Sequence, residues 1–146
     1  MLDGKPYEVF GGLSDKIEIP EEYTTGSITK KPFKTVNSRY DLRLNGFVIK
    51  DIVGTFDNPE YGTLTRLISL SLRHGAHIEY VCSQLQKDKD SNIFSFHKVL
   101  ARVLKKYIEN GRTSSSDKTC ESCGAEGLIY QEGCLMCTAC GYSKCG

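Results

Sequence analysis

The chain carries two cysteine-rich stretches, Cys120-Glu-Ser-Cys123-Gly124 and Cys134-Leu-Met-Cys137-Thr-Ala-Cys140-Gly-Tyr-Ser-Lys-Cys145. Together they hold six of the seven cysteines. A segment of this length cannot bury enough apolar surface to fold by itself. Cysteines spaced C-x-x-C converge on one ion, and two such pairs complete the tetrahedral thiolate site typical of structural zinc. Zinc binding orders such a loop and contributes an apparent free energy of roughly 10–16 kcal/mol. We therefore predict a zinc-ribbon-like tail over residues 120–146.

The identity of the four ligands stays open at this point, because zinc takes four and six cysteines are present. Glycine follows Cys123 and Cys140, and it suits a tight turn in which backbone N–H groups point at the sulfurs. On that local argument the ligands are Cys120, Cys123, Cys137 and Cys140, which leaves Cys134 and Cys145. The competing ligand set is Cys120, Cys123, Cys134 and Cys137, which leaves Cys140 and Cys145. Spacing alone does not decide between the two sets. Between the two stretches, Leu128 to Met136 predicts a hairpin that turns at Glu132-Gly133.

Length, composition and charge indicate one globular domain with an appendage. The chain has 146 residues, 39% of them hydrophobic and 25% charged, and a formal net charge of +1. No long block of one charge is present, so we do not expect a nucleic-acid partner. The apolar runs are short and the N-terminus has no signal-peptide core, so we expect a cytoplasmic protein with no membrane segment. In that reducing compartment, clustered C-x-x-C cysteines favour metal binding or transient redox chemistry.

The first half of the chain has the pattern of a small antiparallel sheet. Short strand candidates are Tyr7–Gly11, Lys16–Ile19 and Ser27–Lys34. The clearest element is a hairpin from Tyr40 to Asp51, because Asn45-Gly46 is a preferred two-residue turn. That turn places Leu44 opposite Phe47 and Leu42 opposite Ile49 on a face that we expect to be buried. Arg43 with Val48, and Asp41 with Lys50, fall on the face expected to be solvated.

Three helices are predicted after residue 57. The first is capped by Asp57 or Asn58, has Pro59 in its first turn and ends at Arg73-His74-Gly75. The second carries Ile78, Val81, Cys82 and Leu85 at helical spacing. The third runs from about Asn92 to Glu109, with an inward stripe made of Phe96, Val99, Leu100, Val103, Leu104 and Tyr107. We expect an α+β accessory domain over residues 1–110, in which a small antiparallel sheet packs with about three helices, a flexible polar linker over 111–119 and the zinc-binding redox tail over 120–146.

The remaining cysteine, the histidines and the basic residues of the third helix are expected to have structural or surface roles. Cys82 lies on an apolar helical stripe, so we expect a buried core residue. The histidines share no ligand spacing, and we expect surface or helix-end positions for His74, His77 and His97. Lys98, Arg102, Lys105 and Lys106 are expected to form a solvated basic face of the third helix. Phosphate-loop, nucleophile-elbow and paired-carboxylate motifs are absent from the sequence.

Three stretches together resemble a known family. They are Gly4-Lys-Pro-Tyr-Glu-Val-Phe10, Gly62-Thr-Leu-Thr-Arg-Leu-Ile-Ser-Leu-Ser-Leu-Arg-His-Gly75 and the stretch from Glu132 to Cys145. In this order they resemble the C-terminal region of adenosylcobalamin-dependent, class II ribonucleotide reductases. The resemblance implies that the catalytic barrel, with its cobalamin, radical-bearing cysteine and nucleotide pocket, lies outside this chain. The chain would then be a fragment of the reductase or the separate subunit of a split enzyme, with the barrel as its partner.

The resemblance also implies a use for two thiols that do not bind zinc. Each ribonucleotide reduction oxidises a cysteine pair in the barrel, and a mobile C-terminal dithiol reduces it again before being reduced by thioredoxin or glutaredoxin. Reductase tails commonly show C-x4-C spacing, which Cys140 and Cys145 match. The resemblance therefore favours Cys140 and Cys145 as the redox shuttle and Cys120, Cys123, Cys134 and Cys137 as zinc ligands. If Cys140 binds zinc instead, Cys134 becomes the partner of Cys145. Lys144 or the zinc centre would lower a shuttle thiol's pKa.

A second function from another class fits part of the same evidence. A zinc-ribbon module can dock a protein or nucleic acid without any redox chemistry. That hypothesis does not explain Cys145, and the near-neutral charge argues against nucleic acid. The number of titratable thiols in the zinc-loaded protein distinguishes the two, because a shuttle has two reactive tail thiols and a docking module has none.

Overall fold

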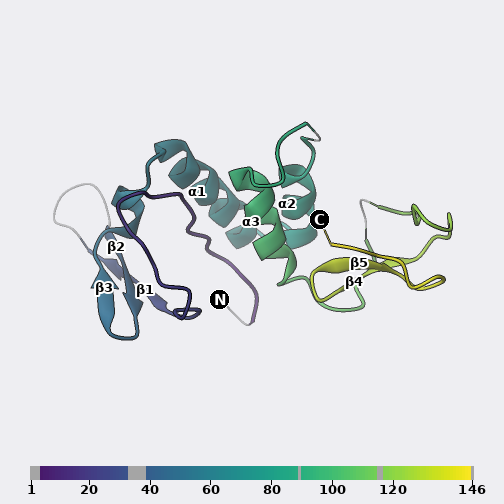
Figure 1. Cartoon of the computed structure of the whole chain (residues 1–146), viewed down its shortest axis with the longest axis horizontal. Coiled ribbons are helices and arrows are strands. Elements are labelled where there is room, and N and C mark those ends of the chain that lie inside the picture. The colour runs from purple at the N-terminus through teal and green to yellow at the C-terminus, as the bar shows by residue number, and fades with distance from the viewer. Residues whose placement is uncertain (1–3, 33–38, 89, 115–116, 146) are drawn as a thin grey trace. The chain divides into compact units, whose positions relative to one another are not determined.

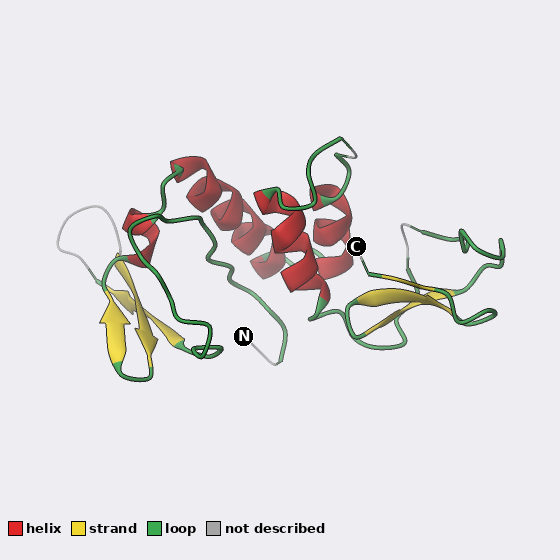
Figure 2. Ribbon diagram, in the orientation of Figure 1, coloured by secondary structure: helices red, strands yellow, loops and turns green. Residues whose placement is uncertain are grey.

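The computed structural model describes residues 4–32, 39–88, 90–114 and 117–145 (Figures 1 and 2). Contacts divide the chain into two compact units. We call Val9–Leu67 the sheet unit, and Met1–Glu8 with Ile68–Gly146 the cysteine unit. The second and third helices and the cysteine tail fall in the same unit. The fold class is confirmed, since the described residues form small antiparallel sheets, three α-helices and a C-terminal cysteine cluster.

The sheet unit contains three antiparallel strands in the order β1 (Ser27–Lys31), β2 (Arg39–Leu44) and β3 (Phe47–Ile49). The predicted hairpin register is confirmed, with Leu42 opposite Ile49 and Leu44 opposite Phe47. Gly46 has φ +101°, a conformation that an L side chain rarely adopts and that the tight turn requires. Residues 33 and 34 of the expected strand Ser27–Lys34 lie outside the described residues.

One residue of the hairpin departs from the predicted pattern of faces. Asp41 was predicted to lie on the solvated face, but it is only 6% exposed. Its Oδ1 accepts the backbone N–H of Asp51 at 3.0 Å, where the chain enters a short 3-10 helix, η1 (Ile52–Thr55). This hydrogen bond gives the buried carboxylate a partner, which offsets the cost of removing it from water.

The expected strands Tyr7–Gly11 and Lys16–Ile19 are not strands in the described chain; both form loops and turns. Packing of side chains, rather than the hydrogen bonds of a β-ladder, holds this segment. The rings of Phe10 and Tyr40 have centroids 4.7 Å apart. A Cβ built on Gly12 would lie 2.2 Å from Cγ of Phe56, so the Phe56 ring rests directly on a backbone that only glycine allows.

The helices are α1 (Pro59–Arg73), α2 (Ile78–Leu85) and α3 (Phe96–Lys105). Asn58 caps α1, because its Oδ1 accepts the N–H of Glu60 at 2.8 Å. The third helix begins later than predicted. Asn92 instead forms a local turn in which its Oδ1 accepts the N–H of Phe94 at 2.9 Å, and such side-chain bonds compete with helix formation. Within the described residues, no helix is long and apolar enough to span a membrane.

Helices α2 and α3 lie side by side and form the core of the cysteine unit (Figure 1). The buried side chains of this core are Cys82, Leu100, Ala101, Leu104 and Ile108. The predicted inward stripe is wrong for three residues, because Val99, Val103 and Tyr107 are 38%, 47% and 47% exposed. Apolar residues occupy two adjacent faces of α3, and α2 packs against one of them.

Candidate metal centre

Four sulfurs from the tail converge on one point. The atoms belong to Cys120, Cys123, Cys137 and Cys140, and all lie within 4.8 Å of one another. The Sγ atoms of Cys120 and Cys140 are 3.7 Å apart, as are those of Cys123 and Cys137. Zinc–sulfur bonds of about 2.3 Å in a tetrahedron place sulfurs about 3.8 Å apart. The described residues therefore hold four cysteines positioned to bind a metal ion, and the donor set fits zinc.

The two halves of this cluster have the same backbone construction. The N–H of Gly124 donates to the carbonyl of Cys120 at 2.8 Å, and the N–H of Gly141 donates to that of Cys137 at 3.0 Å. Both glycines have positive φ, +70° and +74°. The N–H of Cys120 in turn donates to Ala125, and that of Cys137 to Tyr142. Such equivalent turns are the zinc knuckles expected when glycine follows the second cysteine of each C-x-x-C.

A second three-stranded sheet carries the cluster. Its strands are β4 (Leu128–Gln131), β5 (Cys134–Cys137) and β6 (Ser143–Lys144), and they pair in that order. The predicted turn at Glu132-Gly133 is present, with φ of +50° and +80°. In β5, Leu135 and Cys137 are buried, whereas Cys134 is half-buried. Alternation along the strand therefore puts Cys134 and Cys137 on opposite faces.

This alternation explains how the structure divides the six cysteines. Two cysteines three residues apart in a strand have Cα atoms about 10 Å apart and side chains on opposite faces, so they cannot converge on one ion. Cys134 and Cys137 stand in that relationship, whereas Cys137 and Cys140 bracket a turn. The structure therefore has the arrangement of the first ligand set, and it differs from the set favoured by C-x4-C spacing, which gave Cys134 to the metal and Cys140 to the shuttle.

Cys134 and Cys145 form a disulfide, with Cα atoms 4.4 Å apart. Leu135 pairs with Lys144 in the β5–β6 ladder, so the disulfide joins the next two positions across the same pair of strands. That Cα separation is typical of directly opposed, non-hydrogen-bonded residues in an antiparallel pair. The disulfide therefore closes the open end of a hairpin whose other end is the second knuckle.

Hydrogen bonding gives the clustered thiols different acidities in the absence of a cation. Backbone N–H groups of Cys140 and Ala139 lower the pKa of Cys137 to about 7. The N–H of Ala125 acts to lower the pKa of Cys123, but hydrogen bonds with the thiols of Cys140, Cys120 and Cys137 outweigh it and raise that pKa from 9.0 to about 12. Four thiolates cannot share so small a space unless a cation offsets their charge. Metal binding here therefore displaces protons from the cluster.

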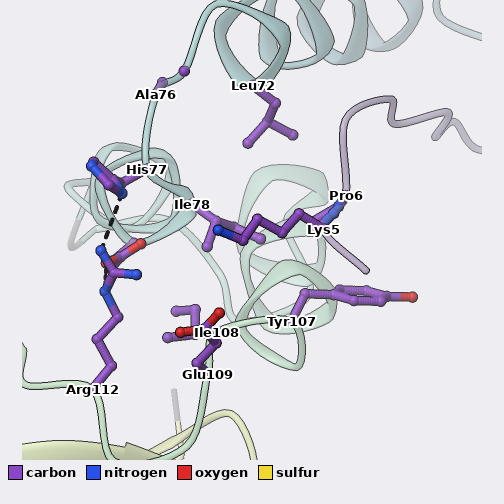
Figure 3. A pocket seen from close by; sticks show the side chains of 12 residues that line it. Lys5, Pro6, Leu72, Ala76, His77, Ile78, Tyr107, Ile108, Glu109 and Arg112 are labelled. Atoms are coloured by element: carbon purple, nitrogen blue, oxygen red, sulfur yellow. Dashed lines mark hydrogen bonds and ion pairs between the residues drawn. The ribbon is translucent and has the colours of Figure 1, made fainter. Parts of the chain in front are cut away.

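Arg112 was expected to belong to a flexible linker, but the structure gives it several partners. Its guanidinium forms an ion pair with Glu79 of α2 and bonds Nδ1 of His77 at 3.1 Å (Figure 3). Its carbonyl accepts the N–H of Tyr130 in β4 at 2.8 Å, and the neighbouring Gly111 N–H donates to Tyr130. Residues 111–114 thus continue the ribbon sheet. A cavity of about 220 Å³ lies beside this ion pair, and Lys5, Tyr107 and Glu109 are among its other lining residues.

Sequence reasoning missed the Arg112–Glu79 pair because the arginine begins a run of polar residues typical of linkers. Glu79 is only 6% exposed and has apolar neighbours in the sequence of α2. No sequence spacing links it to Arg112, which lies 33 residues later in the chain.

Cys82 is 1% exposed, as expected of a core residue. The Lys144 ammonium bonds a carboxylate oxygen of Glu121, which lies between Cys120 and Cys123, and this bond raises the pKa of Lys144.

These features define a class: an α+β domain that carries a zinc-ribbon-like, four-cysteine metal module. The family model described as "NrdJ homologue C-terminal domain" matches residues 1–109. The chain therefore belongs to the family of NrdJ homologue C-terminal domains, and NrdJ is the class II, adenosylcobalamin-dependent ribonucleotide reductase. No curated protein and no solved structure gives a significant match. The matched residues stop before Cys120 and do not include the cysteine tail.

Proposed function

We propose that this chain is the C-terminal accessory part of a ribonucleotide reductase and that its tail supplies the reducing equivalents for deoxyribonucleotide synthesis. Cys120, Cys123, Cys137 and Cys140 hold a structural zinc ion. Cys134 and Cys145 form the dithiol that reduces the oxidised cysteine pair of the catalytic barrel. The observation that carries the proposal is the separation of the six tail cysteines into one cluster of four sulfurs and one disulfide.

Zinc suits a site that is structural and separate from the redox pair, because it has no redox chemistry of its own and is commonly bound by four thiolates. Four cysteines bound to the metal are withdrawn from thiol–disulfide exchange, so two remain to react. Cys145 is exposed and Cys134 half-buried, as a redox pair must be if its sulfurs are to meet those of another protein. The disulfide is thus one state of the proposed cycle, and the dithiol is the other.

The remaining parts of the cycle lie in partners. The catalytic barrel holds the adenosylcobalamin and the substrate, and a thioredoxin or glutaredoxin returns the tail disulfide to the dithiol. We place this cycle in the cytoplasm, where such reductants keep thiols reduced. The isolated chain is accordingly expected neither to bind cobalamin nor to reduce nucleotides, and turnover by this chain alone would contradict the proposal.

The test uses the intact reductase with thioredoxin as reductant. Cys145→Ser and Cys134→Ser should leave the product of a single turnover nearly unchanged, because the barrel's own thiols supply the first pair of electrons. Steady-state turnover should collapse in both variants, and a small dithiol that reaches the barrel directly should restore much of it. Ser143→Ala, an exposed change in β6 two residues before Cys145, is the matched control.

One result would overturn the proposal. If Cys145→Ser and Cys134→Ser both sustained normal thioredoxin-driven turnover, the tail would not carry electrons. A zinc ribbon that docks a partner without redox activity would then be the better account, and the four-cysteine cluster would keep its metal under either outcome.

A further inference from the structure

We propose that the two redox thiols have different roles: Cys145 is the thiol that attacks the target disulfide, and Cys134 is the resolving thiol that stays on the ribbon. This inference rests on the proposed function and deepens it. It follows from an asymmetry in how the two cysteines are held, because Cys134 begins an anchored central strand and Cys145 follows a short edge strand.

Cys134 is anchored through the turn that precedes it. The backbone of Gly133 packs against the end of α3, since a Cβ added there would lie 3.3 Å from the Lys105 carbonyl carbon and the Lys106 nitrogen. The N–H of Glu132 donates to Oδ1 of Asn110 at 2.8 Å. Cys134 then begins β5, which pairs with β4 on one side and β6 on the other. These contacts do not depend on the disulfide, so Cys134 keeps its place when the bond is reduced.

Cys145 is held much more weakly. It follows β6, which has two residues, both exposed, and which lies at the edge of the sheet. Beyond the ladder, the ion pair between Lys144 and Glu121 holds this strand, and the two side chains are 51% and 63% exposed. Exposed ion pairs and two-residue strands add little stability. Reduction of the disulfide therefore removes the main restraint on Cys145.

The released thiol has a defined tether. The second knuckle fixes the chain as far as Tyr142, whose carbonyl accepts the N–H of Cys137 at 2.8 Å. Cys145 lies three residues beyond that tyrosine, and an extended chain of three residues spans about 10 Å. Cys145 can thus leave the ribbon and enter a recessed site on another protein while the metal cluster and Cys134 remain folded behind it.

The electron count follows from two exchanges. The Cys145 thiolate attacks one sulfur of the target disulfide, so a Cys145–target mixed disulfide forms and the second target sulfur leaves as a thiolate. The Cys134 thiolate then attacks Sγ of Cys145, which forms the Cys134–Cys145 disulfide and releases the first target sulfur as a thiolate. Two electrons pass to the target pair, which takes up the two protons that the tail thiols lose. Closure of the disulfide also restores β6, which withdraws the tail from the target.

Single-cysteine variants of the full chain test the order of attack. Cys134→Ser retains Cys145, and Cys145→Ser retains Cys134. Both are loaded with zinc, checked for one zinc ion per chain and mixed with dithiodipyridine, a disulfide probe chosen because it carries no charge that Lys144 would attract. We expect the Cys134→Ser protein to react about tenfold faster or more, since its thiol is the released one. Equal rates, or a faster Cys145→Ser protein, would overturn the role assignment.

A second measurement tests the release itself in the unmodified sequence. Amide hydrogen exchange at Ser143 and Lys144 should be about tenfold faster in the reduced, zinc-loaded chain than in the oxidised one, whereas exchange in β4 should not change. Equal exchange in the two states would contradict the release of β6. The two proposals can fail separately. If the rate ratio is reversed but turnover still needs both thiols, only the assignment of roles is wrong. If turnover is normal without either thiol, the proposed function is wrong.

Discussion

The guanidinium of Arg112 binds the carboxylate of Glu79, a residue that is only 6% exposed. The same arginine accepts the N–H of Tyr130 through its carbonyl oxygen. One residue therefore connects helix α2 to the ribbon that carries the cysteines. The position of the tail on the helices depends on this connection as well as on the contact between Gly133 and the end of α3.

Replacing Arg112 by alanine should destabilise the cysteine unit. The change leaves a buried carboxylate without its cation, and removal of one partner of a fully buried pair costs roughly 3–5 kcal/mol. The Arg112 side chain is 37% exposed, so we expect a smaller loss, about 2 kcal/mol in the free energy of unfolding. Urea denaturation measures it. The double variant Arg112→Ala with Glu79→Gln should recover most of the loss, and an unchanged unfolding midpoint in Arg112→Ala would show that the pair contributes nothing.

The metal ligands are distinguished by two serine substitutions. Cys140→Ser should abolish stoichiometric zinc binding, because its sulfur lies in the cluster of four. Cys134→Ser should retain about one zinc ion per chain, because its sulfur lies on the other face of β5. Elemental analysis of both purified proteins decides the matter. Zinc retained in Cys140→Ser and lost in Cys134→Ser would return the ligand set to the one that C-x4-C spacing favoured.

Chelation should unfold the ribbon and spare the helices. The two knuckles contain few apolar side chains, so the metal is their main source of stability, whereas α2 and α3 share a core of their own. Removal of zinc should therefore speed amide exchange across residues 119–142 while the helical circular dichroism signal is largely kept. Joint loss of both signals at the same chelator concentration would mean that ribbon and helices unfold as one cooperative unit.

The turns were the most predictable part of this fold. Asn45-Gly46 and Glu132-Gly133 predicted both hairpins, because two-residue turns restrict the residues that can form them. The buried face of α3 was less predictable. Val99 and Leu100 lie on adjacent faces of similar hydrophobicity, and packing against α2 buries one of them; periodicity contains no information about that choice.

The four-cysteine cluster differs from the set of cysteines that C-x4-C spacing favoured as metal ligands. The glycines after Cys123 and Cys140 indicated two equivalent turns, which the structure contains. C-x4-C spacing pointed to Cys140 as a shuttle thiol, but spacing along the chain does not say whether Cys134 lies in a strand or a turn. Since β5 begins at Cys134, the side chain points away from the cluster. The contact of Arg112 with Glu79 was beyond prediction, because a lone buried ion pair leaves no pattern in one sequence.

Stability at alkaline pH should depend on Cys82. Burial raises the pKa of this thiol from 9.0 to about 11, so the folded state favours the protonated form. Its contribution is fully present below pH 9 and is lost as pH rises from 9 to 11, since only the unfolded state ionises in that range. The loss should be on the order of 2 kcal/mol. Cys82→Ala should flatten the decline in unfolding free energy over this range. An identical slope in the two proteins would refute the assignment.

The most direct test of the division into four metal ligands and two redox thiols is to count and locate the reactive thiols. The reduced, zinc-loaded chain would be treated with an alkylating agent at neutral pH, and the labelled cysteines identified by mass spectrometry. We predict two labels, on Cys134 and Cys145, with Cys82 protected by burial and the cluster protected by the metal. Labels on Cys140 and Cys145 with Cys134 protected, or no labelled tail cysteine at all, would contradict the account.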